Sequence, residues 1–321
     1  NVLLVAATGA VMLGTLYPLL LDALGLGKIS VGPPYFDAVF VPLMAPVVLL
    51  MGVGPLARWK QASVAELAAR LKWPALLSVV AAVALPFAAG RFSLMVALGL
   101  LLAAWVFTST TVLLMQRART GAGQLARQSR SFWGMVVAHL GVGVFIVGVT
   151  MVKGYETELD VKMAVGDSVV VGGHRFSFKG AQEVQGPNYV AARGTLEVQR
   201  ESGGKPFNMY PEKRLYKVQG MPMTEADIDV GLFRDLYVSL GEMLDDKTWT
   251  VRVYHKPFVD WIWGGAFIMA LGGFLALSDR RYRVAVKAVD LAALQSPAGD
   301  APPAAPQPAF NQVATAERSG S

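Results

Sequence analysis

The sequence has no cysteine, only three histidines and few charged residues, and these shortages exclude several classes of function. Without thiols the chain forms no disulfide, holds no metal through thiolates and performs no thiol chemistry. Charged residues make up 16% of the chain against 54% hydrophobic residues, and the mean hydropathy is +0.44. A soluble globular domain of this length does not normally reach such values. The composition therefore predicts a membrane protein.

The formal net charge of +6 would suggest a nucleic-acid partner if the protein were soluble. The basic residues instead cluster in short connections between apolar runs, where they report membrane topology. We therefore expect the lipid bilayer, and no nucleic acid, as the surroundings of this chain. P-loop, zinc-helix and serine-elbow signatures do not occur, so the sequence identifies no catalytic residue.

Six apolar runs approach or reach the roughly 20 residues that a helix needs to cross a bilayer. We predict spans at residues 1–21, 36–56, 73–89, 93–115, 132–152 and 258–277, with kinks at Pro42 and Pro46 in the second. The fold class that follows is an α-helical polytopic membrane protein with about six transmembrane helices. The chain begins inside an apolar run without a charged segment before it, which favours a piece of a longer protein over a signal peptide.

The distribution of Lys and Arg predicts the orientation. Three alternate connections carry the basic clusters, whereas the others carry only Lys28 and Arg91; the clusters are Arg58, Lys60, Arg70 and Lys72, then Arg117, Arg119, Arg127 and Arg130, then Arg280, Arg281, Arg283 and Lys287. All three fall on one side, so we expect that side to be the cytoplasm. In a bacterial inner membrane, residues 153–257 would then face the periplasm.

Residues 153–257 form a polar insertion with alternating and β-branched segments separated by glycine-rich turns. This pattern predicts a small all-β periplasmic domain, and it leaves a sandwich and a barrel equally open. The predicted organisation is a five-helix transmembrane region at 1–152, the β domain at 153–257 and a last transmembrane helix at 258–277. Residues 278–321 follow in the cytoplasm as a helix at 283–295 and a disordered Pro/Ala-rich tail.

His139 is the one histidine inside a predicted span, about 10 Å beyond the start of its helix. An ionisable side chain at that depth is costly, and imidazole is a common axial ligand of heme iron. Met135 lies on the same helical face, and Gly143, one turn further on, would leave room there for a flat macrocycle. These residues are consistent with a heme site that has His139 as the axial ligand.

The alternative for His139 is a hydrogen bond to a neighbouring helix, with nearby small residues serving helix packing. Gly134, Ala138 and Gly141 form such a small-residue face, and spacing alone does not decide between the two roles. The other two histidines are weaker candidates. We expect His174 to be an exposed turn residue after two glycines, and His255 to join the aromatic and basic residues at the membrane interface.

Several strings in the chain resemble the CcmF family of cytochrome c maturation proteins, within the heme-handling CcmF/NrfE/CcmC group. They follow the family's order and cover nearly all of the chain except its tail; they are residues 24–30, 34–37, 50–55, 138–141, 211–216, 223–226, 234–242 and 251–263. The resemblance is to the C-terminal half of these proteins.

The resemblance implies that His139 is the second of two transmembrane histidines that hold a b-type heme. It further implies a heme lyase component that receives heme from the chaperone CcmE. The heme is then joined to the Cys-x-x-Cys-His thiols of apocytochrome c, which CcmH and CcmI present. The family's tryptophan-rich motif, its periplasmic histidines and its first transmembrane histidine do not occur in this chain. We therefore expect the N-terminal half of a CcmF protein as a partner, and no complete reaction from this half alone.

The β domain is the expected docking surface for these partners, with Arg214, Tyr216, Arg234 and Tyr237 as the candidate residues. Two other functions remain open at this point. One is a transporter that exports heme or a related solute, although no internal repeat supports it. The other is a membrane scaffold with a periplasmic docking domain and no cofactor.

Overall fold

A computed structural model describes residues 1–279 of the chain, apart from 58–62, 120, 122, 219 and 246. Six of the described helices are long and apolar enough to cross a membrane, which confirms the predicted fold class. They are α1 (Val2–Ala23), α2 (Pro33–Val53), α3 (Val64–Ala88), α4 (Leu94–Arg119), α5 (Arg130–Tyr155) and α6 (Val259–Leu277), with a short 3₁₀ turn η1 (Gly54–Leu56) after α2. The predicted helix at 283–295 and the tail after it lie outside the described residues.

Helix α3 begins earlier in the chain than its hydropathy predicted. It starts at Val64 rather than at Trp73, because the Ser63 hydroxyl caps the helix by accepting a hydrogen bond from the Glu66 backbone N–H at 3.1 Å. Glu66 also pairs with Arg70 one turn later. The expectation that Arg70 lies in a connection was therefore wrong, because a capped polar turn extends the helix beyond its apolar part.

Glycines on the facing sides of α5 and α6 let the backbones of the two helices contact each other directly. Three glycines of α5 and two of α6 recur at heptad spacing on the facing sides, namely Gly134, Gly141, Gly148, Gly265 and Gly272. A β-carbon at Gly141 would lie 2.6 Å from the backbone nitrogen of Met269, so no larger residue fits there. The small-residue face predicted for α5 is thus confirmed as a helix-packing face.

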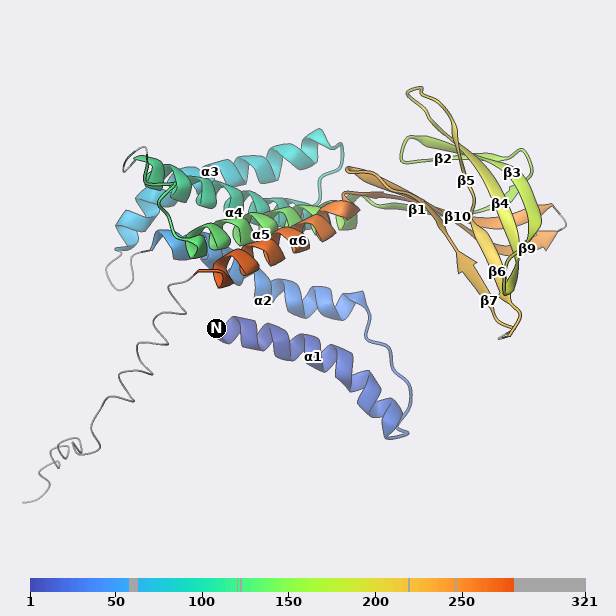
Figure 1. The fold of residues 1–321 in the computed structure, drawn as a ribbon, viewed down its shortest axis with the longest axis horizontal. Helices are drawn as coiled ribbons and strands as arrows, with labels where there is room; N and C mark the ends of the chain where they lie inside the picture. Colours follow the sequence, from blue (N-terminus) through green and yellow to red (C-terminus); the bar gives the residue numbers. More distant parts are fainter. Residues whose placement is uncertain (58–62, 120, 122, 219, 246, 280–321) are drawn as a thin grey trace, which may run out of the picture. The chain divides into compact units, whose positions relative to one another are not determined.

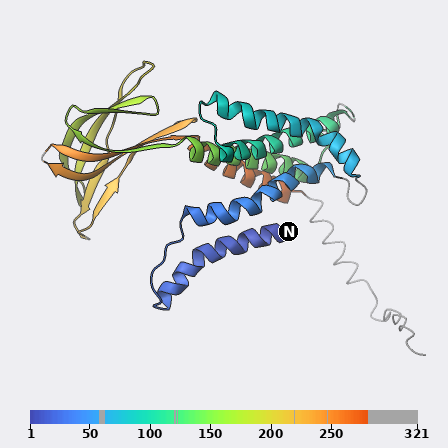
Figure 2. The same ribbon diagram turned by 180° about the vertical axis from the view of Figure 1, so that it is seen from behind.

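Helices α1 and α2 lie side by side in both views (Figures 1 and 2). The Tyr35 hydroxyl of α2 donates to the carbonyl of Ala10 in α1 at 2.9 Å, and Gly14 makes room for the Tyr35 ring. Pro42 and Pro46 both lie inside α2, which continues through them from Pro33 to Val53.

Between α5 and α6 the chain forms two antiparallel sheets. One has the strand order β1-β10-β9-β8, and the other has the order β2-β3-β4-β6-β7, with β5 paired to β4. The strands are β1 (Thr157–Ala164), β2 (Ser168–Val171), β3 (His174–Gln185), β4 (Tyr189–Arg200), β5 (Phe207–Met209), β6 (Glu212–Tyr216), β7 (Pro222–Glu225), β8 (Asp227–Asp229), β9 (Arg234–Asp245) and β10 (Thr248–Pro257).

The two sheets share one apolar core, as in a β-sandwich. Alternate residues of each sheet point inward and are almost completely buried, namely Phe176, Phe178, Leu196 and Val198 from one sheet and Leu236, Val238, Leu240, Val251 and Val253 from the other. Strands β1 and β10 pair with Thr157 opposite His255, which brings the two connections to the helices next to each other. The sequence left a sandwich and a barrel equally open, and the two packed sheets show that the domain is a sandwich.

Candidate functional site

His139 lies on the face of α5 that is turned away from α6. It lines a pocket with residues of α2, η1, α4 and α5 itself, namely Met51, Gly52, Pro55, Ser109, Thr110, Leu113, Met135 and Val136. The free volume of this pocket is about 0 Å³, so its own side chains fill it. The Trp105 indole of α4 donates to the carbonyl of Leu49 at 2.9 Å and holds α2 against α4 beside the pocket.

The imidazole of His139 is oriented by its own helix. Its Nδ1–H donates to the backbone carbonyl of Met135 at 2.8 Å, because that oxygen can only accept. In the neutral imidazole this hydrogen bond places the proton on Nδ1 and leaves Nε2 with its lone pair, the arrangement found in metal-bound histidines. Met135 thus supplies both the orienting carbonyl and part of the pocket wall, and the imidazole fits the role of one axial ligand.

Gly143 makes room for a protein ring. A β-carbon there would lie 2.7 Å from the edge of the Phe107 ring of α4. The space that we expected for a macrocycle beside Gly143 is therefore occupied by Phe107. Since the pocket has no free volume, a heme bound through Nε2 would extend beyond these residues.

The two β-domain histidines form a pair that the sequence did not reveal. His174 is only 6% exposed, so its prediction as an exposed turn residue was wrong. Its ring lies 6.3 Å from the His255 ring, and its Nδ1–H donates to the Gly172 carbonyl at 2.9 Å. Gly172 has φ +57 and faces the His255 ring, where a β-carbon would lie 2.3 Å away. The turn between β2 and β3 therefore folds over β10, and the half-buried His255 ring packs against this turn.

This histidine pair predicts a loss of stability in mild acid. Burial lowers the pKa of both imidazoles, and Arg234 lowers both further. Arg200 also lowers the pKa of His174, whereas the hydrogen bond to Gly172 and the Asp229 charge act against this shift, and His174 lowers the pKa of His255. The folded domain thus favours neutral rings, whereas the unfolded chain takes up protons near the ordinary imidazole pKa of 6.5. The stabilising contribution is complete above that pH and is lost as the pH falls through the lowered folded values.

We expect the β domain of the full chain to unfold at a lower urea concentration at about pH 5 than at about pH 7.5. Urea titrations followed by proteolysis of residues 157–257 measure this difference. In His255→Gln the pH dependence should be smaller, because one titrating ring is removed. An unchanged pH dependence in that variant would show that the pair is not its source.

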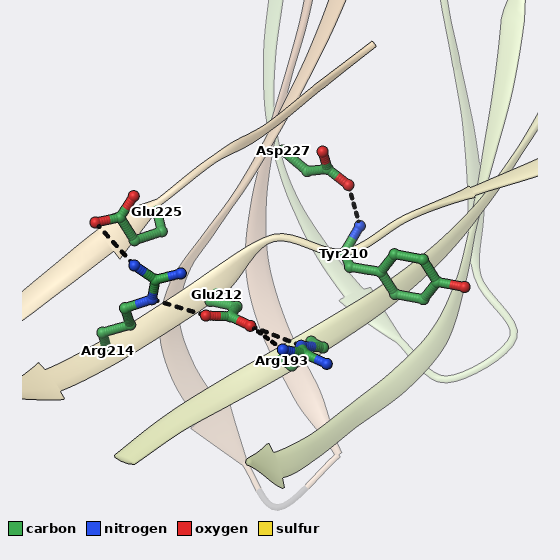
Figure 3. A network of polar contacts seen from close by, with 6 residues as sticks. All are labelled: Arg193, Tyr210, Glu212, Arg214, Glu225 and Asp227. Atoms are coloured by element: carbon green, nitrogen blue, oxygen red, sulfur yellow. Dashed lines mark hydrogen bonds and ion pairs between the residues drawn. The ribbon is translucent and has the colours of Figure 1, made fainter. Parts of the chain in front are cut away.

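A polar groove lies on the sheet that contains β3, β4, β6 and β7, and Figure 3 shows the polar contacts among its residues. At its centre the Glu212 carboxylate, 7% exposed, accepts hydrogen bonds from Arg193 at 2.6 Å and from Arg214 at 2.7 Å. Burial alone would raise the pKa of Glu212, but the two guanidinium groups outweigh it and hold that pKa below its usual value. Glu225 pairs with Arg214 at 3.5 Å.

The groove is open and has a volume of about 470 Å³. Gln182, Tyr210, Ala226 and Asp227 complete its lining, and Asp227 accepts a hydrogen bond from the Tyr210 backbone (Figure 3). These residues come from separate strands and connections, so no spacing in the sequence could have joined them. The groove presents both guanidinium and carboxylate groups to the solvent.

The four docking candidates do not form one surface. Arg214 and Tyr216 lie on β6, where the Arg214 guanidinium stacks over the Tyr189 ring at 4.5 Å and also lines the groove. Arg234 and Tyr237 lie on β9 of the other sheet, where Tyr237 packs edge-on against another tyrosine ring. Arg214 is therefore the one candidate that reaches an open recess.

Comparison with known proteins links the sequence and the fold to the same relatives. Residues 154–257 match the family model described as the CcmF C-terminal beta-sandwich. The chain is 46% identical over 289 residues to the cytochrome c-type biogenesis protein CcmF of Pseudomonas fluorescens, which covers 89% of this chain and 44% of that protein. For CcmF of Escherichia coli the identity is 45% over 285 residues, covering 88% and 43%.

A solved structure titled Cytochrome c Heme Lyase CcmF shares the fold, with a TM-score of 0.68 and 24% identity. The match covers 86% of this chain and 44% of that one. The chain thus spans less than half the length of the relatives that it matches.

Proposed function

Because the chain belongs to the CcmF family, as the counterpart of the C-terminal half of its members, we propose that it acts in cytochrome c biogenesis as part of a heme lyase. The observation that carries this proposal is the orientation of His139. Its Nδ1 is bound to the Met135 carbonyl inside the helical region, so Nε2 is the nitrogen that can bind iron.

We propose that His139 supplies one axial ligand to a b-type heme. The other histidines of the chain lie in β3 and β10, so a second histidine ligand would come from elsewhere, in this proposal from the N-terminal half of a CcmF protein. When bound, this heme would pass electrons to the heme that is being attached. The residues of this chain orient the imidazole, through the hydrogen bond from His139 to the Met135 carbonyl.

The proposed placement is a bacterial inner membrane with the β domain in the periplasm. The basic residues at the adjoining ends of α4 and α5, such as Arg117 and Arg130, support a cytoplasmic position for the connection between them. In the periplasm the polar groove around Arg214 would dock CcmE, or the CcmH and CcmI proteins that present apocytochrome c. Its mixture of guanidinium and carboxylate groups suits a charged peptide surface.

Two variants in the complete assembly separate the heme role from the docking role. His139→Ala should lose the b-heme absorbance of the purified complex and the maturation of c-type cytochromes, because the iron loses a ligand. Glu225→Lys should keep the b-heme absorbance and reduce co-purification of the partners, because it reverses a charge on the groove rim.

His255→Ala is the matched control for the heme role, since it removes a histidine outside the helices. It should keep the b-heme absorbance. If His139→Ala kept both heme and maturation, the ligand role would be wrong. If Glu225→Lys left partner binding unchanged, the groove would not be the docking surface.

A further inference from the structure

The connection between β8 and β9 exposes three apolar side chains in succession. Val230, Leu232 and Phe233 are 63%, 64% and 58% exposed, and only Gly231 separates them. Loops with this much apolar surface are uncommon in water, since their burial elsewhere is favourable. The segment 230–233, named here the β8–β9 loop, therefore needs an apolar partner.

The β8–β9 loop is held rigidly against the start of α6. The Trp261 indole donates to the carbonyl of Leu232 at 2.9 Å, and the Phe258 backbone N–H donates to the carbonyl of Phe233 at 3.1 Å. Within the loop, the Gly231 N–H donates to the Asp235 carboxylate at 3.0 Å. The exposed side chains are thus presented in a fixed place.

That place is the end of a membrane span. Helix α6 begins at Val259, directly after β10 (Figure 1), and its first turn carries Trp261. The Phe233 ring lies 5.6 Å from the Phe258 ring and 6.2 Å from the Trp261 ring. Clusters of aromatic rings at the end of a span are typical of the boundary between headgroups and hydrocarbon.

The charged residues next to the loop do not oppose contact with lipid. Arg234 donates to both the backbone carbonyl and the carboxylate of Asp229, and Asp235 is buried beneath the loop. These groups are paired or turned inward, so the surface that the loop presents is apolar.

We propose that the β8–β9 loop inserts Val230, Leu232 and Phe233 into the interface of the lipid bilayer. The loop then adds a non-covalent contact with the membrane to the two covalent connections of the β domain, to α5 and to α6. A lipid partner is favoured over a protein partner because the loop is bound to the first turn of a membrane span and its Phe233 ring lies beside the rings of Phe258 and Trp261.

The absence of cysteine makes a direct test possible. Leu232→Cys in the otherwise unchanged full chain would carry the only thiol, which can be labelled with an environment-sensitive fluorophore in phosphatidylethanolamine/phosphatidylglycerol vesicles. Val218→Cys is the matched control, because Val218 is 94% exposed in the turn after β6. Its neighbour Lys217 donates to the carbonyl of Asn188 in the connection between β3 and β4, beyond the end of β3 that is opposite His174.

We expect lipids with a nitroxide near the headgroup to quench the label at Leu232 and aqueous iodide to have little effect on it. The label at Val218 should show the reverse. Val230→Cys gives an independent reading and should behave like Leu232→Cys. Strong iodide quenching at both loop positions would overturn the proposal. Protection from both quenchers would also overturn it, because protein rather than lipid would then cover the loop.

Discussion

Replacing Gly272 with valine is expected to destabilise the helical region by about 3 kcal/mol or more, because the substitution overpacks a backbone contact. A β-carbon at Gly272 would lie 2.5 Å from the backbone nitrogen of Ala138 and 2.6 Å from the carbonyl oxygen of Gly134. Neither atom can move aside as a flexible side chain could, so α5 must shift away from α6. The shift would displace His139, the residue after Ala138, so heme binding should fall together with stability.

Gly273→Val is the control for this prediction, since nothing lies within 4 Å of a β-carbon at Gly273. It introduces the same side chain into the same helix one residue later and should change stability by less than about 1 kcal/mol. Thermal unfolding of the full chain in detergent, followed by circular dichroism, compares the two variants. Equal losses would show that α6 does not depend on the glycine contact.

Replacing Glu212 with alanine is expected to destabilise the β domain by about 2–3 kcal/mol. The substitution leaves the Arg193 and Arg214 guanidinium groups without the carboxylate between them. Removing one partner of a buried ion pair typically costs about 3–5 kcal/mol. We place the effect below that range because both arginines are partly exposed, so water can replace some of the lost hydrogen bonds.

Glu225→Ala is the control for this prediction, because it also removes a carboxylate partner of Arg214, but one that is not buried. Glu225 also pairs with Arg214, but at 3.5 Å and with a partly exposed side chain, so its removal should cost less than about 1 kcal/mol. Urea titration with pulse proteolysis of the β domain in the full chain measures both variants. A larger loss for Glu225→Ala than for Glu212→Ala would contradict the central position of Glu212 in the network.

The helices were predictable because a membrane span must be apolar over its whole length, and a sliding sum of hydropathy detects this directly. The start of α3 was missed for the same reason. Its first turns at Val64–Arg70 carry two charged residues and are stabilised by the Ser63 cap and the Glu66–Arg70 pair. A hydropathy sum does not detect either of these interactions. The small-residue face of α5 was visible, but its partner face on α6 required the structure.

His139 was identifiable because an ionisable residue stands out within an apolar run. The His174–His255 pair was not, because the two residues lie on β3 and β10 and meet only when the turn at Gly172 closes over β10. The groove around Glu212 was missed for a similar reason. The role of Gly143 depended on a neighbour, Phe107, that no local pattern specifies.

The measurement that bears most directly on the central claim is the optical spectrum of the complete complex carrying His139→Gly, recorded with and without added imidazole. We predict that the b-heme absorbance is lost in this variant and that imidazole restores it, because free imidazole can replace the missing Nε2 donor in the space left by the side chain. A b-heme spectrum in His139→Gly that matches the unmodified complex without imidazole would contradict the assignment of His139 as an iron ligand.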